Sequence, residues 1–276
     1  MIKINSEVPL CMLGQNNDLN DYDFVLFHLY KTNQTYKEYF LNQRQSNPDR
    51  LMIFDNSAYE FFVKGEELKM EEFYKAIVEL KPDYYILPDT LMNRYRTIVD
   101  TWAFIRNYGE KIQQSTNSKP LAVIQGKSIE DFMECAVWYA DIHIDAIAVP
   151  FHNSFYKEME VDDDIEQEFL IEFGPNNLDA KYAMGRVQFF KDYGEYLKKT
   201  FKHIHILGSH QPFEKRWYHD FDTMDTGYPV KCGLEGMILG EDFIKPDVII
   251  DDFLTKDLPD DVRTLIANNI RTFKQI

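Results

Sequence analysis

Three aspartates and one glutamine in this sequence have the types and the spacing of an active site. Asp55, Asp89 and Gln125 each follow a short apolar segment, at intervals close to one strand plus one helix. Asp225 belongs to a later apolar segment. In a parallel barrel such positions meet at the carboxyl ends of the strands. There one carboxylate can attack an electrophilic carbon such as a sugar C1, while the other groups bind the edge of a flat heterocycle.

The segment around Asp225 predicts that this carboxylate is presented on a bend. Gly227 and Pro229 follow it closely, and residues of these types favour a tight turn. We therefore expect Asp225 not to be buried inside a regular element. The alternative is that Asp-Thr-Gly serves turn formation only, just as Asp55 or Asp89 alone could cap the next helix.

Apolar segments alternate with helix-like segments along the chain. We expect strands at 24–30, 51–54, 84–87, 121–124, 146–149, 203–207, around 225 and, most weakly, at 248–250. Helices are expected at 35–43, 70–80, 94–108, from an N-cap at 128, at 181–200 and at 260–273. About eight such units favour one (β/α)8 TIM-type barrel over residues 1–276, with an acidic insertion at 158–172 after the fifth expected strand. A doubly wound open sheet is the alternative, but no Gly-x-Gly-x-x-Gly follows the first strand.

Composition narrows the class of protein. The net charge of -16 opposes nucleic acid at long range, because phosphate binding draws on Lys and Arg. Cys11, Cys135 and Cys232 lie far apart, so neither a disulfide framework nor a Cys-x-x-Cys zinc site is predicted. No apolar run approaches the roughly 20 residues of a membrane span, and no signal-peptide core opens the chain. We expect a cytoplasmic protein.

Five short motifs, in order, resemble the tRNA-guanine transglycosylases and their DNA-acting relatives, which insert 7-deazaguanines into DNA. The first resembles that family's Asp-Ser-Gly-Gly/Ala-Phe segment, the second places its base-recognising Asp, and the third is similar to its Val-Gln-Gly. The fourth resembles Met-Gly-Val-Gly-x-Pro-Glu and the fifth the nucleophile segment Asp-x-Phe-Asp-x-x-x-Pro. In this chain the five motifs are Phe54–Tyr59, Pro88–Thr90, Val123–Gly126, His205–Glu214 and Phe221–Pro229.

The resemblance implies a role for each matching residue. Asp225 would be the nucleophile that displaces guanine and forms a covalent glycosyl-enzyme, and Asp55 the general acid or base at the exchanging base. Asp89 and Gln125 would bind the edge of that base. The double displacement that the resemblance implies needs no redox cofactor, so no cofactor is expected. Three further residues of the motifs, Gly126, Gly208 and His210, are expected to contact substrate.

Departures from the family pattern favour its zinc-free, DNA-acting branch. The Cys-rich zinc site of the tRNA enzymes has no counterpart, and Val149-Pro150-Phe151-His152 replaces a Gly-rich loop. The expected partners are nucleic acid, DNA rather than tRNA, and a 7-deazaguanine base. Tyr59, Phe151 and Tyr228 are candidates to stack on a flipped-out base, with packing as the alternative for each. His152 and His210 could contact phosphate or assist proton transfer, with a structural or simply exposed histidine as the alternative for each.

Two other functions stay open. With the same barrel, water could resolve the intermediate, giving a base-releasing N-glycosidase. A non-catalytic family member would instead bind base or nucleic acid for a protein partner, with a homodimer as another possible assembly.

Overall fold

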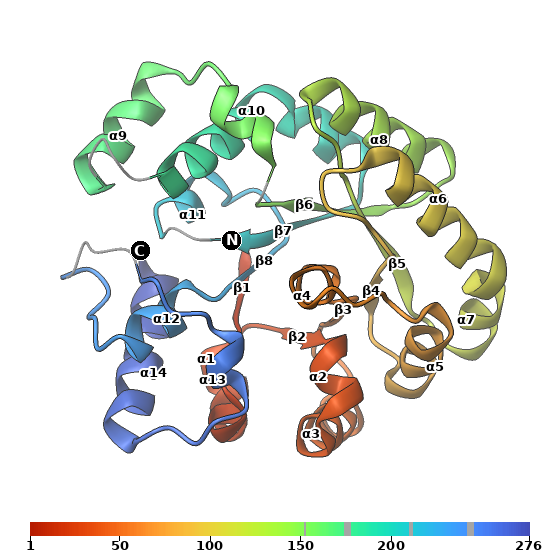
Figure 1. Cartoon of the computed structure of the whole chain (residues 1–276), viewed down its shortest axis with the longest axis horizontal. Coiled ribbons are helices and arrows are strands. Elements are labelled where there is room, and N and C mark those ends of the chain that lie inside the picture. Colours follow the sequence, from red (N-terminus) through yellow and green to blue (C-terminus); the bar gives the residue numbers. More distant parts are fainter. Residues whose placement is uncertain (152, 174–177, 210–211, 242–245) are drawn as a thin grey trace. The chain divides into compact units, whose positions relative to one another are not determined.

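The computed structural model describes residues 1–151, 153–173, 178–209, 212–241 and 246–276. Its strands pair in parallel in the order β1-β8-β7-β6-β5-β4-β3-β2, and helices separate them along the chain (Figure 1). The first strand pairs with the last, as closure of a barrel requires. This topology confirms the predicted (β/α)8 TIM-type fold class.

The bounds of the elements are as follows. The strands are β1 (Lys3–Ser6), β2 (Asp23–Leu26), β3 (Met52–Asp55), β4 (Tyr84–Ile86), β5 (Lys119–Val123), β6 (Ala146–Pro150), β7 (His203–Ser209) and β8 (Thr223–Thr226). The α-helices are α1 (Asn16–Leu19), α2 (Phe27–Thr32), α3 (Gln34–Ser46), α4 (Ala58–Lys64), α5 (Met70–Leu80), α6 (Arg94–Phe104), α7 (Glu110–Ser115), α8 (Ile129–Asp141), α9 (Asp163–Phe173), α10 (Leu178–Thr200), α11 (Glu214–Trp217), α12 (Tyr228–Leu234), α13 (Asp251–Leu254) and α14 (Asp260–Gln275).

The predicted strand count is right, but two assignments were wrong. The chain has a strand before the first expected one, β1, whose Ile4 is buried. The last expected strand, 248–250, is not one: the backbone N–H groups of Asp247 and Val248 donate to the Glu235 carboxylate rather than to a strand. The acidic insertion therefore follows the sixth strand, not the fifth, and much of it forms α9.

The first expected strand, 24–30, is also shorter than predicted. The chain becomes helical at Phe27, directly after β2. Side chains accept hydrogen bonds from two backbone N–H groups at this junction. The N–H of Leu26 donates to the Tyr36 hydroxyl, and the N–H of His28 donates to Ser57 Oγ. Apolar residues alone could not reveal this change, since both the strand and the helix are buried here.

The chain falls into two compact units. The first unit contains residues 1–21, 151–199 and 204–276, and the second contains residues 22–150 and 200–203. The single domain predicted for residues 1–276 stays a prediction. Within the described ranges, no helix has the length and apolar character that crossing a membrane requires.

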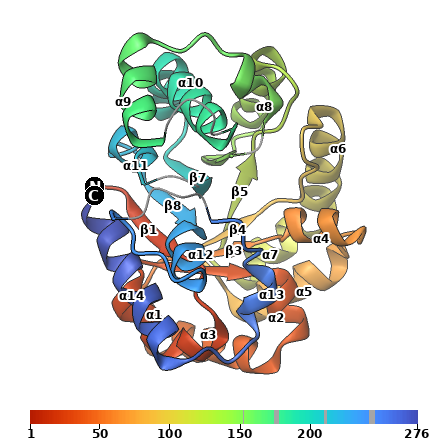
Figure 2. The same ribbon diagram turned by 60° about the vertical axis from the view of Figure 1, so that its left-hand side comes forward.

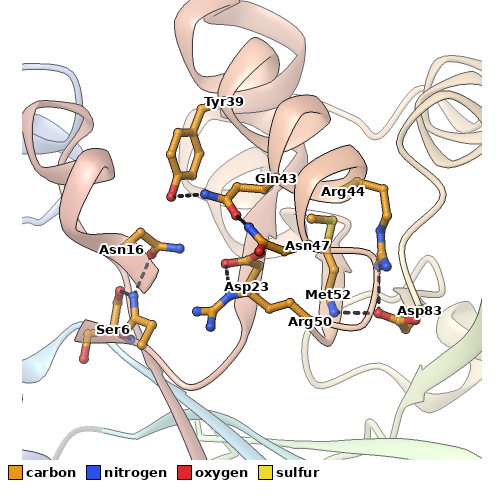
Figure 3. Close-up of polar contacts among 11 residues, drawn as sticks. Ser6, Asn16, Asp23, Tyr39, Gln43, Arg44, Asn47, Arg50, Met52 and Asp83 are labelled. Carbon is orange, nitrogen blue, oxygen red and sulfur yellow. Dashed lines mark hydrogen bonds and ion pairs between the residues drawn. The ribbon is translucent and has the colours of Figure 1, made fainter. Parts of the chain in front are cut away.

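Aspartates placed just before strands connect neighbouring strands at their amino ends. In the second unit, Asp83 Oδ2 accepts from the Met52 N–H at 2.8 Å and from Arg44 Nη2 at 2.7 Å (Figure 3). In the first unit, Asp222 Oδ2 accepts from the Ile204 N–H at 2.8 Å. The amino ends of barrel strands usually serve stability, whereas chemistry takes place at the carboxyl ends. These aspartates are therefore structural.

In the first unit, α12 packs closely against α14 (Figures 1 and 2). Gly233 makes this approach possible, because a Cβ atom there would lie 2.5 Å from the Ile266 side chain and less than 3 Å from its backbone. Helix α12 begins two residues after β8. Its packing therefore fixes the chain that follows Asp225.

Candidate functional site

Asp225 lies inside β8 and only 4% of it is exposed, so the prediction of a presented carboxylate outside any regular element was wrong. Gly227 is the N-cap of α12, with φ -93°, and Pro229 lies in the first helical turn. Proline is well tolerated there because its missing N–H would have no helical partner. The two residues therefore start a helix rather than bend the chain.

Hydrogen bonds compensate for the burial of Asp225. Its Oδ1 atom lies 3.0 Å from His205 Nε2 and accepts from the Gly208 N–H at 2.8 Å. Gly208 has a φ of 66°, a left-handed conformation that glycine adopts without steric cost. Within the described part of the chain, Oδ2 accepts no hydrogen bond. One carboxylate oxygen is thus fixed by two donors, and the other is left for a further partner.

His205 is a site residue that the sequence reasoning did not single out. Its buried ring bridges two side chains, with Nδ1 2.9 Å from Thr223 Oγ1 and Nε2 facing Asp225. The Nε2–H tautomer satisfies both contacts, because the Thr223 hydroxyl then donates to Nδ1. His205 lies opposite Thr223 in the pairing of β7 with β8. The one available signal was that His205 alternates with apolar residues in the strand, as His203 also does.

In the second unit, Asp89 and Gln125 lie together as predicted, and Asn56 joins them. Asn56 Nδ2 donates to Asp89 Oδ1 and Gln125 Nε2 donates to Asp89 Oδ2, both at 2.8 Å. Backbone N–H groups fix the two amides, because Met92 N donates to Gln125 Oε1 and Ala58 N donates to Asn56 Oδ1. Both NH2 groups must therefore point at the carboxylate. We call these three residues the Asp89 cluster.

The Asp89 carboxyl is poised to titrate near neutrality. Burial raises its pKa from 3.8 to about 6, the bonds from Asn56 and Gln125 oppose this rise, and the nearby Asp100 carboxylate adds to it. The side chain is half-buried, so part of it is exposed. A half-buried carboxyl with a shifted pKa that follows a barrel strand is typical of functional sites.

Asp55 ends β3, and its Oδ2 accepts from the Ser57 N–H at 2.7 Å. Ser57 has a φ of 58°, which is uncommon for a residue other than glycine. Its hydroxyl accepts from the His28 N–H at 3.1 Å and lies 3.0 Å from His28 Nδ1. Burial, aided by the charge of Lys64, lowers the pKa of His28 to about 4. The ring is therefore neutral at pH 7.

Two predicted substrate residues have clear packing roles. A Cβ atom at Gly126 would lie 2.5 Å from Asp131 Cβ and 2.9 Å from the Phe132 N, so glycine permits the close approach of α8. Phe151 is buried, and the guanidinium of Arg186 lies 4.8 Å from its ring centroid. That distance is typical of a cation–π contact.

The remaining candidates differ in exposure. Tyr59, on α4, is 56% exposed, whereas Tyr228, at the start of α12, is buried. His152 and His210 lie outside the described residues. In the described ranges, no group of three or more His, Cys, Asp or Glu side chains is arranged to bind a metal ion.

The predicted residues thus form two groups, one in each unit. Asp225 and Gly208 are hydrogen-bonded in the first unit, together with His205. Asp89 and Gln125 are hydrogen-bonded in the second unit, which also contains Asp55 and the glycine at 126.

No family model and no curated protein matches the sequence. Among solved structures, the chain is similar to KGPDC from Streptococcus mutans, with 11% identity and a TM-score of 0.47 over 100% of this chain and 99% of that one. It is also similar to the carboxyl transferase domain of Rhizobium etli pyruvate carboxylase, solved with pyruvate, with 10% identity and a TM-score of 0.50. That match covers 97% of this chain and 47% of the other, and it supports the fold alone.

Proposed function

We propose that this protein is an enzyme, a base-exchange transglycosylase that replaces guanine in nucleic acid with a 7-deazaguanine. DNA is favoured over tRNA as the polymer because the Cys-rich zinc site of the tRNA enzymes has no counterpart in the sequence. The observation that carries the proposal is the asymmetry of Asp225. Its Oδ1 is bound by His205 and Gly208, and its Oδ2 has no hydrogen-bond donor among the described residues.

This asymmetry suits a carboxylate nucleophile. Two donors on Oδ1 fix the plane of the carboxylate, so Oδ2 points in one direction without the cost of ordering it during the reaction. Because Oδ1 is already bound by two donors, Oδ2 is the oxygen that stays available to a ligand. Asp222, which precedes the same strand, differs in being exposed, and its Oδ2 binds the β7 backbone.

The proposed reaction is a double displacement. Asp225 Oδ2 bonds to C1 of the sugar while the bond from C1 to N9 of guanine breaks, and N9 is protonated as guanine leaves. The incoming 7-deazaguanine loses its N9 proton and attacks C1, which breaks the ester bond and restores the carboxylate. Two such displacements retain the configuration at C1. The resemblance assigns these proton transfers to Asp55.

The Asp89 cluster suits the edge of guanine. That edge presents N1–H and N2–H groups, and an ionised carboxylate can accept from both. The amides of Asn56 and Gln125 stabilise the ionised form of Asp89 and leave its exposed part for a ligand. Ser57 adds support, because it has a left-handed φ of 58° at the position where the family segment has glycine.

The test is incorporation of labelled 7-deazaguanine into guanine-containing DNA or tRNA. We expect label in the polymer and a denaturant-resistant adduct between protein and nucleic acid, both absent in Asp225→Asn. The matched control is Asp222→Asn, an aspartate at the start of the same strand segment, whose amide oxygen can still accept the Ile204 N–H. We expect this control to retain activity.

Other outcomes identify the competing functions. Guanine released without incorporated label, in a reaction that Asp225→Asn abolishes, would show an N-glycosidase. Binding of base or polymer that is unchanged in Asp225→Asn, with neither release nor incorporation, would show a non-catalytic binding protein and contradict the proposal.

A further inference from the structure

A fully buried ion pair lies next to the Asp225 site in the first unit. Arg186, on α10, and Glu214, at the start of α11, are both 0% exposed. Arg186 Nη2 donates to both carboxylate oxygens of Glu214, at 2.9 and 3.1 Å. The guanidinium also lies 4.8 Å from the ring of Phe151 and 5.6 Å from that of Tyr218. The pair is thus held in one orientation.

A gain in folding stability does not by itself explain why the protein contains such a buried ion pair. Removing two charges from water costs several kcal/mol per ion, and apolar residues of similar volume often stabilise a protein as well or better. In addition, Arg186 Nε is buried without a hydrogen-bond partner among the described residues. The pair is better explained by what it orients.

Arg186 binds the peptide group that holds Asp225. Its Nη1 donates to the Leu207 carbonyl oxygen at 3.0 Å. That carbonyl belongs to the same planar peptide unit as the Gly208 N–H, which donates to Asp225 Oδ1. Because the unit is rigid, a rotation that broke one of these bonds would also break the other. A bond to the carbonyl also polarises the unit and strengthens its N–H as a donor.

Glu214 binds the side chain of the residue that follows Gly208, and Thr226 binds the backbone of that residue. Ser209 Oγ donates to Glu214 Oε2 at 2.7 Å, and Thr226 Oγ1 donates to the Ser209 carbonyl at 2.6 Å. The two charges therefore fix the chain on both sides of Gly208, a residue whose left-handed φ would otherwise be one of several accessible conformations.

We propose that Arg186 and Glu214 are positioning residues that hold the peptide between Leu207 and Gly208 so that its N–H orients the Asp225 carboxylate. The inference rests on the proposed function, in which Asp225 is the nucleophile. Neither residue needs to touch the substrate for this role.

The test uses the double variant Arg186→Met/Glu214→Gln, which leaves no unpaired buried charge and keeps an acceptor for Ser209. The matched control is Lys198→Met/Asp220→Asn, which removes an exposed ion pair of the same unit, 3.3 Å in length. Circular dichroism and thermal unfolding establish that both variants fold. Arg186→Lys serves as a second variant, because lysine keeps the charge but cannot bind Glu214 and the Leu207 carbonyl with a planar fork.

Two measurements are made on the full chain. Amide hydrogen exchange at Gly208 reports the positioning directly, and we expect it to be at least about tenfold faster in the double variant than in the control. The single-turnover rate of adduct formation reports its effect on chemistry. We expect that rate to fall about 10- to 100-fold, with the Kd for DNA unchanged and with partial recovery in Arg186→Lys.

The outcomes separate this inference from the proposed function. Unchanged exchange at Gly208 in a folded double variant would overturn the inference, and so would a wild-type rate of adduct formation in that variant. If the wild-type protein forms no adduct at all, the proposed function fails and the catalytic part of the inference fails with it. A change in Gly208 exchange would then support the positioning of the peptide alone.

Discussion

Asp89→Asn should change how the stability of the protein depends on pH. The folded protein holds the Asp89 proton up to a pKa of about 6, whereas the ordinary value of the carboxyl is 3.8. Between these values the native state binds more protons than the unfolded state, so the free energy of unfolding falls as pH rises. The destabilisation is complete above the folded pKa and absent below the unfolded one.

The structure sets the size of this effect. A difference of about 2 pKa units corresponds to about 3 kcal/mol at about 1.4 kcal/mol per unit. This figure is an upper bound, because Asp89 is half-buried and water reaches part of it. Asparagine removes the titration but sets its NH2 group against a donor of Asn56 or Gln125. The free-energy cost of placing these donors against each other is the same at every pH. The slope of stability against pH therefore reports the ionisation of Asp89 alone.

Urea unfolding of wild type and Asp89→Asn at several pH values between about 4 and 7 measures the slope. We expect the stability of the variant relative to wild type to rise across this window by up to about 3 kcal/mol. Asp141→Asn, at the exposed end of α8, controls for the loss of one negative charge. If the stability of Asp89→Asn relative to wild type changed with pH no more than that of the control, the assignment of a raised pKa to Asp89 would be refuted.

Three further predictions concern stability. Gly185→Ala should lower the free energy of unfolding in urea by about 3 kcal/mol or more, because a Cβ atom there would lie 1.9 Å from the Tyr156 carbonyl oxygen. A free energy of unfolding close to that of wild type would contradict this contact. Ser128→Ala should cost about 1 kcal/mol, since Ser128 Oγ accepts from the Asp131 N–H as the N-cap of α8; an unchanged melting temperature would argue against the cap. Ser57→Ala should be less stable than Ser57→Gly by about 1 kcal/mol, because both lose the hydroxyl but only alanine keeps the left-handed strain. Equal stabilities would count against that strain.

The periodic parts of the fold were predictable from the sequence. Helix α5 has the predicted bounds because Phe73, Ile77 and Leu80 recur at helical spacing and are buried. The N-cap at Ser128 was predicted from a serine with an acidic residue, Asp131, three positions on, and its bond is present. The approach of Asp89 and Gln125 followed from strand–helix spacing, since the ends of neighbouring parallel strands lie side by side.

Local sequence could not supply what depends on distant partners. It placed Asp225 on a bend, but His205 and Gly208, about 20 residues away, provide the bonds that allow its burial in β8. It likewise gave no sign that Arg186 and Glu214 would meet, because a charged residue on a helix is usually exposed.

The sequence by itself therefore determined most of the strands and helices, though not β1 or the true end of β2, and which polar residues follow the strands, because burial periodicity is a property of neighbours along the chain. Only the tertiary structure decided which polar groups are buried and bonded. Burying a polar group is favourable only when a partner satisfies it, and here those partners come from other elements of the fold.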